Sequence, residues 1–320
     1  MKRLRCLVAG VILFSTVAGA VDAQTIRFGH FPNVTHAQGV IAHAFSRQGK
    51  GWFEERLGPG VKIEWYTYNA GPSAMEAIFA RSLDLTYVGP NPALNAHLKS
   101  NGAEIRIISG AATGGAALLV GGDGKITKPA DFRGKKIATP QLGNTQDISC
   151  RAWLKAQGFK ITMTGGDATI LPTANPDQMA LFMRGGVDAV WTVEPWVTRL
   201  EREAKAKVFL NETDVITTWL AASAKFLSEQ RELAKKIAQA NVELTQWMQE
   251  HPEEAQKMLI AELKEETRAS FAPEIIADSW KRIKFTADIP RNFVDKAVKD
   301  AQDAGFLKGN TDISKLIETP

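Results

Sequence analysis

The sequence predicts an α/β protein with two lobes, and three observations lead to this prediction. Apolar runs typical of strands alternate with helical patterns over most of the 320 residues. A single hydrophobic core rarely grows beyond about 250 residues, so this length favours two lobes. Four strand-to-helix junctions also have a similar composition, because their loops are rich in small, uncharged polar residues. The alternation of strands and helices further predicts mostly parallel sheets.

The first series of elements alternates strand and helix. Its strands are expected at residues 24–30, 61–67, 84–88 and 104–109, and its helices at 34–46, 73–81 and 92–99. Pro72 suits the first turn of the second of these helices, because its missing N–H has no intrahelical partner there.

A second series of elements includes a strand that ends at a glycine-rich stretch, residues 121–124. Its strands are expected at residues 116–120, 136–139, 168–171 and 187–192, and its helices at 146–157, 176–184 and 195–204. Gly158 is well suited to the position just after a helix end. This pattern predicts a second lobe over residues 115–212.

Helices dominate after residue 222. Apolar residues recur every three or four positions at Leu233, Ile237, Ala240, Leu244 and Trp247, which predicts a helix that ends at Pro252. Two more helices are expected at 273–283 and 290–304. The charged residues of this region are interpreted as a solvated surface; they are Lys235, Lys236, Glu253, Glu254, Lys264, Glu265 and Glu266.

The N-terminus has the pattern of a secretory signal peptide. A basic start is followed by an apolar stretch at residues 7–17, which is too short to span a bilayer, and then by small residues. We expect cleavage after Ala23, with a cut after Ala20 as the alternative, and therefore a periplasmic protein.

The net charge and the number of cysteines argue against several classes of function and structure. Removing residues 1–23 lowers the net charge from +4 to about +2, which gives no argument for nucleic acid or for a membrane surface. Cys150 is then the one remaining cysteine, so no internal disulfide can form. We expect this thiol to be buried on a helix.

The four junctions, at residues 27–35, 65–73, 85–92 and 137–145, carry the functional prediction. A helix N-terminus offers unpaired N–H groups and a partial positive charge. Ligands of open α/β sheets bind beyond the carboxyl ends of the strands, where all four junctions lie. Each junction alone is also explained by ordinary helix capping. Together, they predict an anion site without Lys or Arg, in a cleft that closes by a hinge.

Titratable residues are few near these junctions. Neither His36 nor any other histidine has a Cys or carboxylate at ligand spacing, so no metal site is predicted. His36 could instead donate a hydrogen bond to an anion and is the one nearby side chain able to add charge. Glu194 follows a predicted strand, where a binding role and a capping role both stay open. No catalytic motif occurs, so no catalytic residue is assigned.

Several of these segments resemble one known family, namely the periplasmic substrate-binding proteins of ABC importers for sulfonates, taurine, nitrate and bicarbonate. The residues that carry the resemblance are 82–89 (SLDL through Gly89), 129–140 (PADFRGKKIATP), 186–190 (GVDAV), 194–196 (EPW) and 251–255 (HPEEA).

The resemblance implies a type II-like binding protein with a ligand cleft between its lobes and a helical C-terminal region. The first lobe is expected to be discontinuous, with residues 24–114 and 213–320, and the second lobe to cover 115–212. The ligand-binding residues that the resemblance implies, together with His36, are Phe31, Pro32, Asn33, Asn69, Gly71, Ser73, Gly89, Asn91, Thr113, Gly114, Gly143, Asn144, Thr145, Glu194 and Trp196.

We therefore expect a monomeric binding protein, not an enzyme, without a cofactor. It would deliver a small organic oxyanion such as an aliphatic sulfonate to the membrane permease and ATPase subunits of an ABC importer. Three alternatives stay open. They are a nitrate- or bicarbonate-type binding protein, an enzyme resembling a pyrimidine-synthesis family (whose cysteine cluster is absent here), and a protein that presents its ligand to a membrane sensor.

Overall fold

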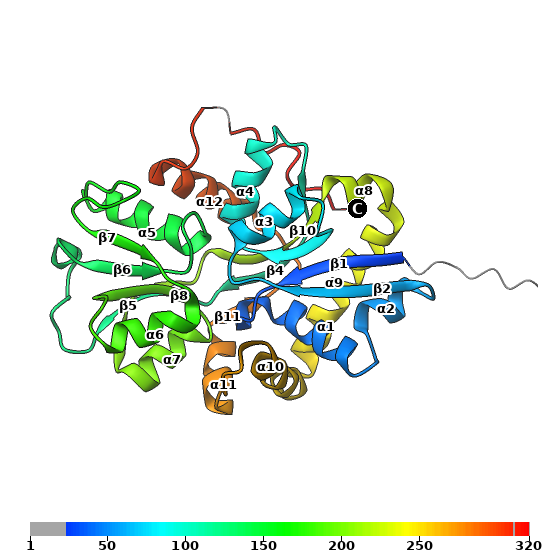
Figure 1. Cartoon of the computed structure of the whole chain (residues 1–320), viewed down its shortest axis with the longest axis horizontal. Helices are drawn as coiled ribbons and strands as arrows, with labels where there is room; N and C mark the ends of the chain where they lie inside the picture. The colour runs from blue at the N-terminus through cyan, green and yellow to red at the C-terminus, as the bar shows by residue number, and fades with distance from the viewer. Residues whose placement is uncertain (1–23, 310, 320) are drawn as a thin grey trace, which may run out of the picture.

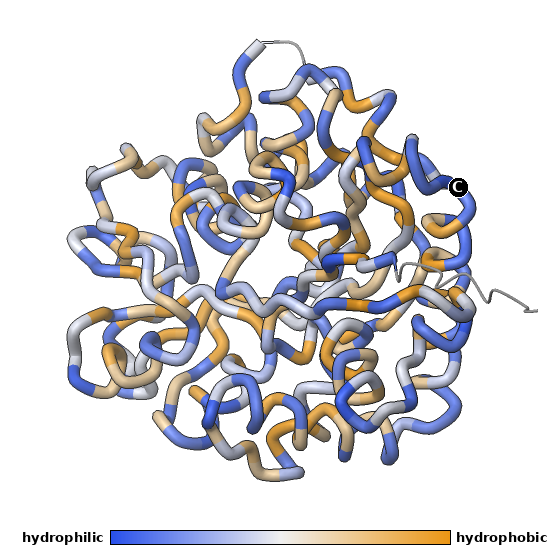
Figure 2. The backbone as a smooth tube through the Cα atoms, turned by 45° about the vertical axis from the view of Figure 1, so that its right-hand side comes forward, coloured by the Kyte–Doolittle hydropathy of each residue, from blue (hydrophilic) through white to orange (hydrophobic). Residues whose placement is uncertain are grey.

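Two α/β lobes lie beside each other in the computed structural model, which describes residues 24–309 and 311–319 (Figure 1). The predicted signal peptide lies outside the described residues. Within them, no helix has both the length and the apolar character to cross a membrane. Hydrophilic segments gather along the outer turns and hydrophobic segments toward the interior of each lobe (Figure 2).

The first lobe is built on a six-stranded sheet in the order β11-β4-β10-β3-β1-β2. Its strands are β1 (Gln24–His30), β2 (Val61–Thr67), β3 (Leu85–Val88), β4 (Ile105–Gly114), β10 (Ile216–Ser223) and β11 (Ile283–Phe285). β1 is parallel to both of its neighbours, and Phe28 is aligned with Trp65 on one side and with Leu85 on the other.

The second lobe is built on a five-stranded sheet in the order β7-β6-β8-β5-β9. Its strands are β5 (Ala116–Gly121), β6 (Lys136–Thr139), β7 (Thr169–Pro172), β8 (Ala189–Val193) and β9 (Ala206–Glu212). The chain enters this sheet between β4 and β5 and leaves it between β9 and β10. The residue limits predicted for the two lobes stay a prediction.

The expectation of mostly parallel sheets is wrong. In the described part of the chain, the pairings of β10 with β3 and β4, of β11 with β4, and of β5 with β8 and β9 are all antiparallel. The reason lies in the connections. β5 and β10 follow short crossings between the sheets, without the crossover helix that a parallel neighbour needs.

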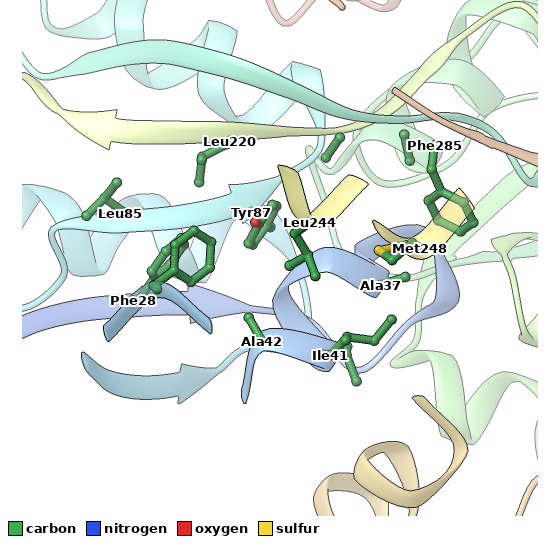
Figure 3. Close-up of a cluster of buried hydrophobic side chains, with 14 of the residues drawn as sticks. Phe28, Ala37, Ile41, Ala42, Leu85, Tyr87, Leu220, Leu244, Met248 and Phe285 are labelled. Atoms are coloured by element: carbon green, nitrogen blue, oxygen red, sulfur yellow. The ribbon is translucent and has the colours of Figure 1, made fainter. Parts of the chain in front are cut away.

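Helices cover both faces of the first sheet. On one face, α1 (Ala37–Arg47), α2 (Trp52–Leu57), α9 (Arg231–Glu250) and α10 (Pro252–Thr267) enclose a core that includes Phe28, Ile41, Tyr87 and Leu244 (Figure 3). On the other face, α3 (Gly71–Phe79) and α4 (Pro90–Lys99) bury a second apolar cluster. Two further helices are α8 (Ala224–Glu229) and α11 (Pro273–Lys281).

The second sheet is covered by α5 (Thr145–Ala156) on one face and by α6 (Asn175–Met183) and α7 (Trp196–Ala204) on the other. Cys150 is fully buried on α5, as predicted, and burial raises its pKa well above the ordinary value. It packs with Leu154 and Trp191, so the thiol acts as a small apolar side chain.

Helix α12 (Arg291–Ala304) contacts both lobes. Val294 and Ala297 join the cluster under α4 in the first lobe. Further along the helix, Ala301 and Ala304 pack against Ile148 of α5 in the second lobe. Helix α12 therefore connects the two lobes.

The prediction for Pro252 is half right. Helix α9, which was predicted from the regularly spaced apolar residues, ends at Glu250. A further helix, α10, begins at Pro252 itself. The missing N–H of proline suits a first turn as well as it suits a break. One residue of α10 also departs from the predicted solvated surface, because the Glu266 side chain is only 2% exposed.

Candidate functional site

A small cavity lies between the two lobes where all four junctions meet. From the first lobe it is lined by Phe31, Asn33, Thr35, His36, Asn69, Ala70, Gly71, Gly89, Pro92 and Thr217. From the second lobe it is lined by Pro140, Asn144, Thr145, Gln146, Asn175 and Val193. Within the part of the chain that the structure describes, this lining contains no Lys, Arg, Asp or Glu.

The cavity is sized for a small polar group. The centre of a water molecule can move within about 20 Å³ of it, and one water needs at least about 10–15 Å³ on the same measure. A small head group therefore suits this conformation better than a long hydrocarbon tail.

Helix N-termini supply the donors around the cavity. The starts of α3 and α5 contribute lining residues, and Asn175 is the first residue of α6. The first N–H groups of each helix have no intrahelical acceptor and carry a partial positive charge. α4 offers fewer of them, because Pro90 and Pro92 have no N–H.

Two side-chain atoms on the cavity wall are buried and have no hydrogen-bond partner among the residues that the structure describes. They are Nδ1 of His36 in the first lobe and Oγ1 of Thr145 in the second. Leaving a buried polar atom unsatisfied costs roughly 1–3 kcal/mol, so such atoms mark a place where a ligand can compensate. Here they come from opposite sides of the cavity.

His36 does not bring a charge to the site, contrary to the sequence-based expectation. Its side chain is buried, and this burial, followed by the nearby His30, holds its pKa well below the ordinary value. The imidazole is therefore neutral at neutral pH, and it can donate from only one of its nitrogens. Its ring lies against Phe31, with centroids 4.3 Å apart.

The loop before α5 is shaped by a buried ion pair. Asp147 accepts hydrogen bonds from the backbone N–H of Gly143 (2.9 Å), the hydroxyl of Thr139 (3.1 Å) and the Nε of Arg151 (2.9 Å). Asn144 caps the helix by accepting from the Asp147 N–H. These bonds fix the direction in which the first turn of α5 faces the cavity.

The two lobes contact each other directly across the cavity. The Asn33 side-chain oxygen accepts from Trp196 Nε1 at 2.9 Å and from Asn175 Nδ2 at 3.4 Å, both in the second lobe. Gln141 donates to the Ser73 hydroxyl at 3.1 Å. The structure therefore has its lobes closed on one another.

Half of the predicted site residues line the cavity, namely Phe31, Asn33, His36, Asn69, Gly71, Gly89, Asn144 and Thr145. The others do not line it, namely Pro32, Ser73, Asn91, Thr113, Gly114, Gly143, Glu194 and Trp196. Asn91, for example, donates to the backbone oxygen of Ala297.

Glu194 has a structural environment. Its fully buried carboxylate accepts from the N–H and hydroxyl of Thr198 and from the hydroxyl of Ser279, at 2.9–3.1 Å. Burial raises its pKa, and these hydrogen bonds oppose that shift. The carboxylate thus joins α7 to α11.

Sequence reasoning missed eight lining residues. Thr35, Ala70, Pro92 and Pro140 lie within the four junctions, and Gln146 directly follows the last of them. Asn175 directly precedes a predicted helix and Val193 directly follows a predicted strand, so the sequence pattern pointed to both positions. Thr217 lies on β10 and carried none, because only the sheet order brings that strand beside β3.

The two lobes with a cavity between them give this structure the fold of the periplasmic binding proteins. More specifically, the chain belongs to the NMT1-like family, whose family model matches residues 19–263.

Relatives agree with the family resemblance seen in the sequence. The chain is 27% identical to a putative aliphatic sulfonates-binding protein of Bacillus subtilis, over 84% of this chain and 83% of that protein. It is 25% identical to the taurine-binding periplasmic protein of Escherichia coli, over 55% and 52% of the two chains.

Solved structures share the fold. The alkanesulfonate-binding protein SsuA of Xanthomonas axonopodis, bound to MOPS, superposes with a TM-score of 0.75 at 18% identity, covering 92% of this chain and 98% of that one. The nitrate-binding protein NrtA of Synechocystis gives 0.73 at 15% identity, covering 92% and 86%.

Proposed function

We propose that this protein is the periplasmic solute-binding component of an ABC importer and binds a small organic oxyanion, such as an aliphatic sulfonate. One observation carries the proposal. Neutral donors from both lobes, including the unpartnered His36 Nδ1 and Thr145 Oγ1, surround a cavity whose described lining has no acidic side chain. Such a wall attracts an anion through dipoles and hydrogen bonds.

The rest of the proposal follows from the relatives. Two of them are named as sulfonate- or taurine-binding proteins. We infer that this chain is likewise exported after cleavage near Ala23, acts as a monomer without a cofactor, and passes its ligand unchanged to a permease and its ATPase. Closing of the lobes about the crossings at residues 114–116 and 212–216 would hold the ligand.

A nitrate- or bicarbonate-type ligand is the second candidate, and the size of the cavity favours it. A space of about 20 Å³ suits a compact ion without a tail. An organic sulfonate needs the neighbouring side chains or the lobes to give way around its carbon atoms.

A panel of anions tests the proposal. Thermal unfolding and titration calorimetry are measured with ethanesulfonate, taurine, nitrate and bicarbonate. Ligand present at 100 times Kd should raise the free energy of unfolding by about 2.7 kcal/mol. A response to the sulfonates alone supports the proposal, and a response to nitrate or bicarbonate alone supports the second candidate. A folded protein that responds to no anion contradicts both.

A further inference from the structure

Three side chains from separate parts of the first lobe bring one polar atom each to a single buried point. His30 ends β1, His43 lies on α1 and Glu266 lies on α10. His30 Nε2 and His43 Nδ1 are 3.1 Å apart, and Glu266 Oε1 lies 3.0 and 2.9 Å from them. The His30 and Glu266 side chains are at most 2% exposed.

Protons alone satisfy this triangle poorly. Each ring nitrogen carries at most one proton, and the ionised carboxylate carries none. If both nitrogens donate to Glu266, their protons face each other across the short distance between the rings. If only one nitrogen is protonated, one side of the triangle has no hydrogen bond. A cation at the centre would instead engage all three lone pairs.

We propose that His30, His43 and Glu266 bind a divalent transition-metal ion, with Zn²⁺ the best match. Two imidazoles and a carboxylate are ligands that Zn²⁺ accepts at about 2.0–2.2 Å, and in a tetrahedral site such atoms lie about 3.3 Å apart. The observed separations of 2.9–3.1 Å need widening by only a few tenths of an ångström.

The surroundings of the triangle support a metal ion. The second oxygen of Glu266, Oε2, is buried and has no hydrogen-bond partner in the described part of the chain, so it can complete a bidentate carboxylate or accept a hydrogen bond from a metal-bound water. His30 Nδ1 lies 3.5 Å from the Phe31 carbonyl oxygen, and a proton held there leaves Nε2 free to coordinate. The His43 ring stacks on Trp65, which limits its movement.

Glu262, one turn before Glu266 on α10, is the candidate fourth ligand. Its Oε1 lies 3.3 Å from His43 Nδ1 and accepts a hydrogen bond from Arg47 Nε at 2.6 Å. Three protein ligands with this carboxylate or a water in the fourth position complete a zinc coordination shell. The ion would join β1, α1 and α10 directly behind the loop that begins at Phe31.

The test uses the chain without a polyhistidine tag, stripped with a chelator and dialysed first against Zn²⁺ and then against metal-free buffer. Metal content is measured by mass spectrometry, and unfolding is followed with and without Zn²⁺. We expect one Zn²⁺ per chain and a rise in Tm of about 5 °C. His43→Gln and Glu266→Gln should each lose the ion and the rise in Tm.

His251→Gln is the matched control, because it removes an exposed histidine at the start of the same helix α10. It should keep both the ion and the Tm rise, and loss of the ion in this variant would overturn the proposal. Failure of the wild-type chain to retain Zn²⁺, or retention by both cluster variants, would overturn it too. Should those variants not fold, the wild-type chain loaded with Co²⁺ must show the intense visible bands of a tetrahedral ion, and their absence contradicts the site.

Discussion

At the residue scale, the hydroxyl of Thr145 is the clearest single contributor to the proposed anion site, because it is buried, unpartnered and on the cavity wall. Thr145→Val keeps the shape of the side chain and removes the hydrogen bond. A hydrogen bond to a charged group is worth about 1.5–3 kcal/mol, so the Kd measured by calorimetry should rise roughly 10- to 100-fold. The same change at exposed Thr25 on β1 should leave the Kd unchanged. An unaltered Kd in Thr145→Val would remove this hydroxyl from the site.

The charge state of His36 leads to a prediction about pH. Burial holds its pKa well below the ordinary value, so the imidazole is already neutral at pH 7 and has no proton to lose as the pH rises. Anion affinity measured by calorimetry should therefore stay constant within about twofold between pH 7 and pH 9. A cationic His36 would instead make the affinity fall by up to about tenfold per pH unit above its pKa. Such a fall in the wild type, absent in His36→Gln, would contradict the neutral assignment.

At the scale of single elements, the buried Asp147–Arg151 pair positions the first turn of α5. Asp147→Asn leaves the Arg151 charge uncompensated, and breaking such a pair costs about 3–5 kcal/mol in the free energy of unfolding. Urea denaturation should show this loss. The double variant Asp147→Asn/Arg151→Met should recover part of it, because no lone charge is then left buried. A double variant no more stable than the single one would show that the pair contributes through something other than charge.

Helices and strands with a long periodic or apolar pattern were predictable from the sequence, and the first-lobe helix α10 shows where the pattern misleads. Pro252 has the same local effect whether a helix has just ended or is about to begin, so the sequence alone could not separate a stop from a start. The antiparallel direction of some strands could not be predicted from the sequence either. β10 lies between β3 and β4 only because the chain returns from the second lobe, and no local pattern encodes that return.

The candidate site was predictable to the extent that it consists of helix starts. Asn33, Gly71, Gly89 and Thr145 lie at junctions whose composition signals a helix N-terminus, and the structure gathers them around one cavity. The metal cluster was not predictable, because Glu266 lies more than 200 positions from both histidines and looks like a surface charge in sequence. Only the packing of α10 against α1 brings these groups together.

At the scale of the whole molecule, closing of the lobes controls access to the cavity. Side-chain hydrogen bonds join the lobes beside the cavity, among them two to Asn33 and one between Gln141 and Ser73. Gly89 of the first lobe approaches Thr145 of the second so closely that a Cβ added to this glycine would lie 2.4 Å from the hydroxyl oxygen. The backbone of Gly89, with φ −67° and ψ 156°, suits any residue, so the lack of a side chain serves the approach of the lobes.

Gly89→Ala should therefore hinder closure without unfolding the protein. If the ligand is held only when the lobes close, the closed state must be reached against this clash, and the apparent Kd rises in inverse proportion to the fraction of protein that remains able to close. An increase of about tenfold or more in Kd is expected for a clash of 1.4 kcal/mol or more, while the Tm without ligand should change little. Gly165→Ala is the control, because an added Cβ meets no atom within 4 Å there. Small-angle X-ray scattering at a ligand concentration that saturates the wild type but lies below the Kd of the variant should show a compact wild type and a more extended Gly89→Ala variant. Equal compaction and equal Kd would mean that the lobes do not need this approach to hold the ligand.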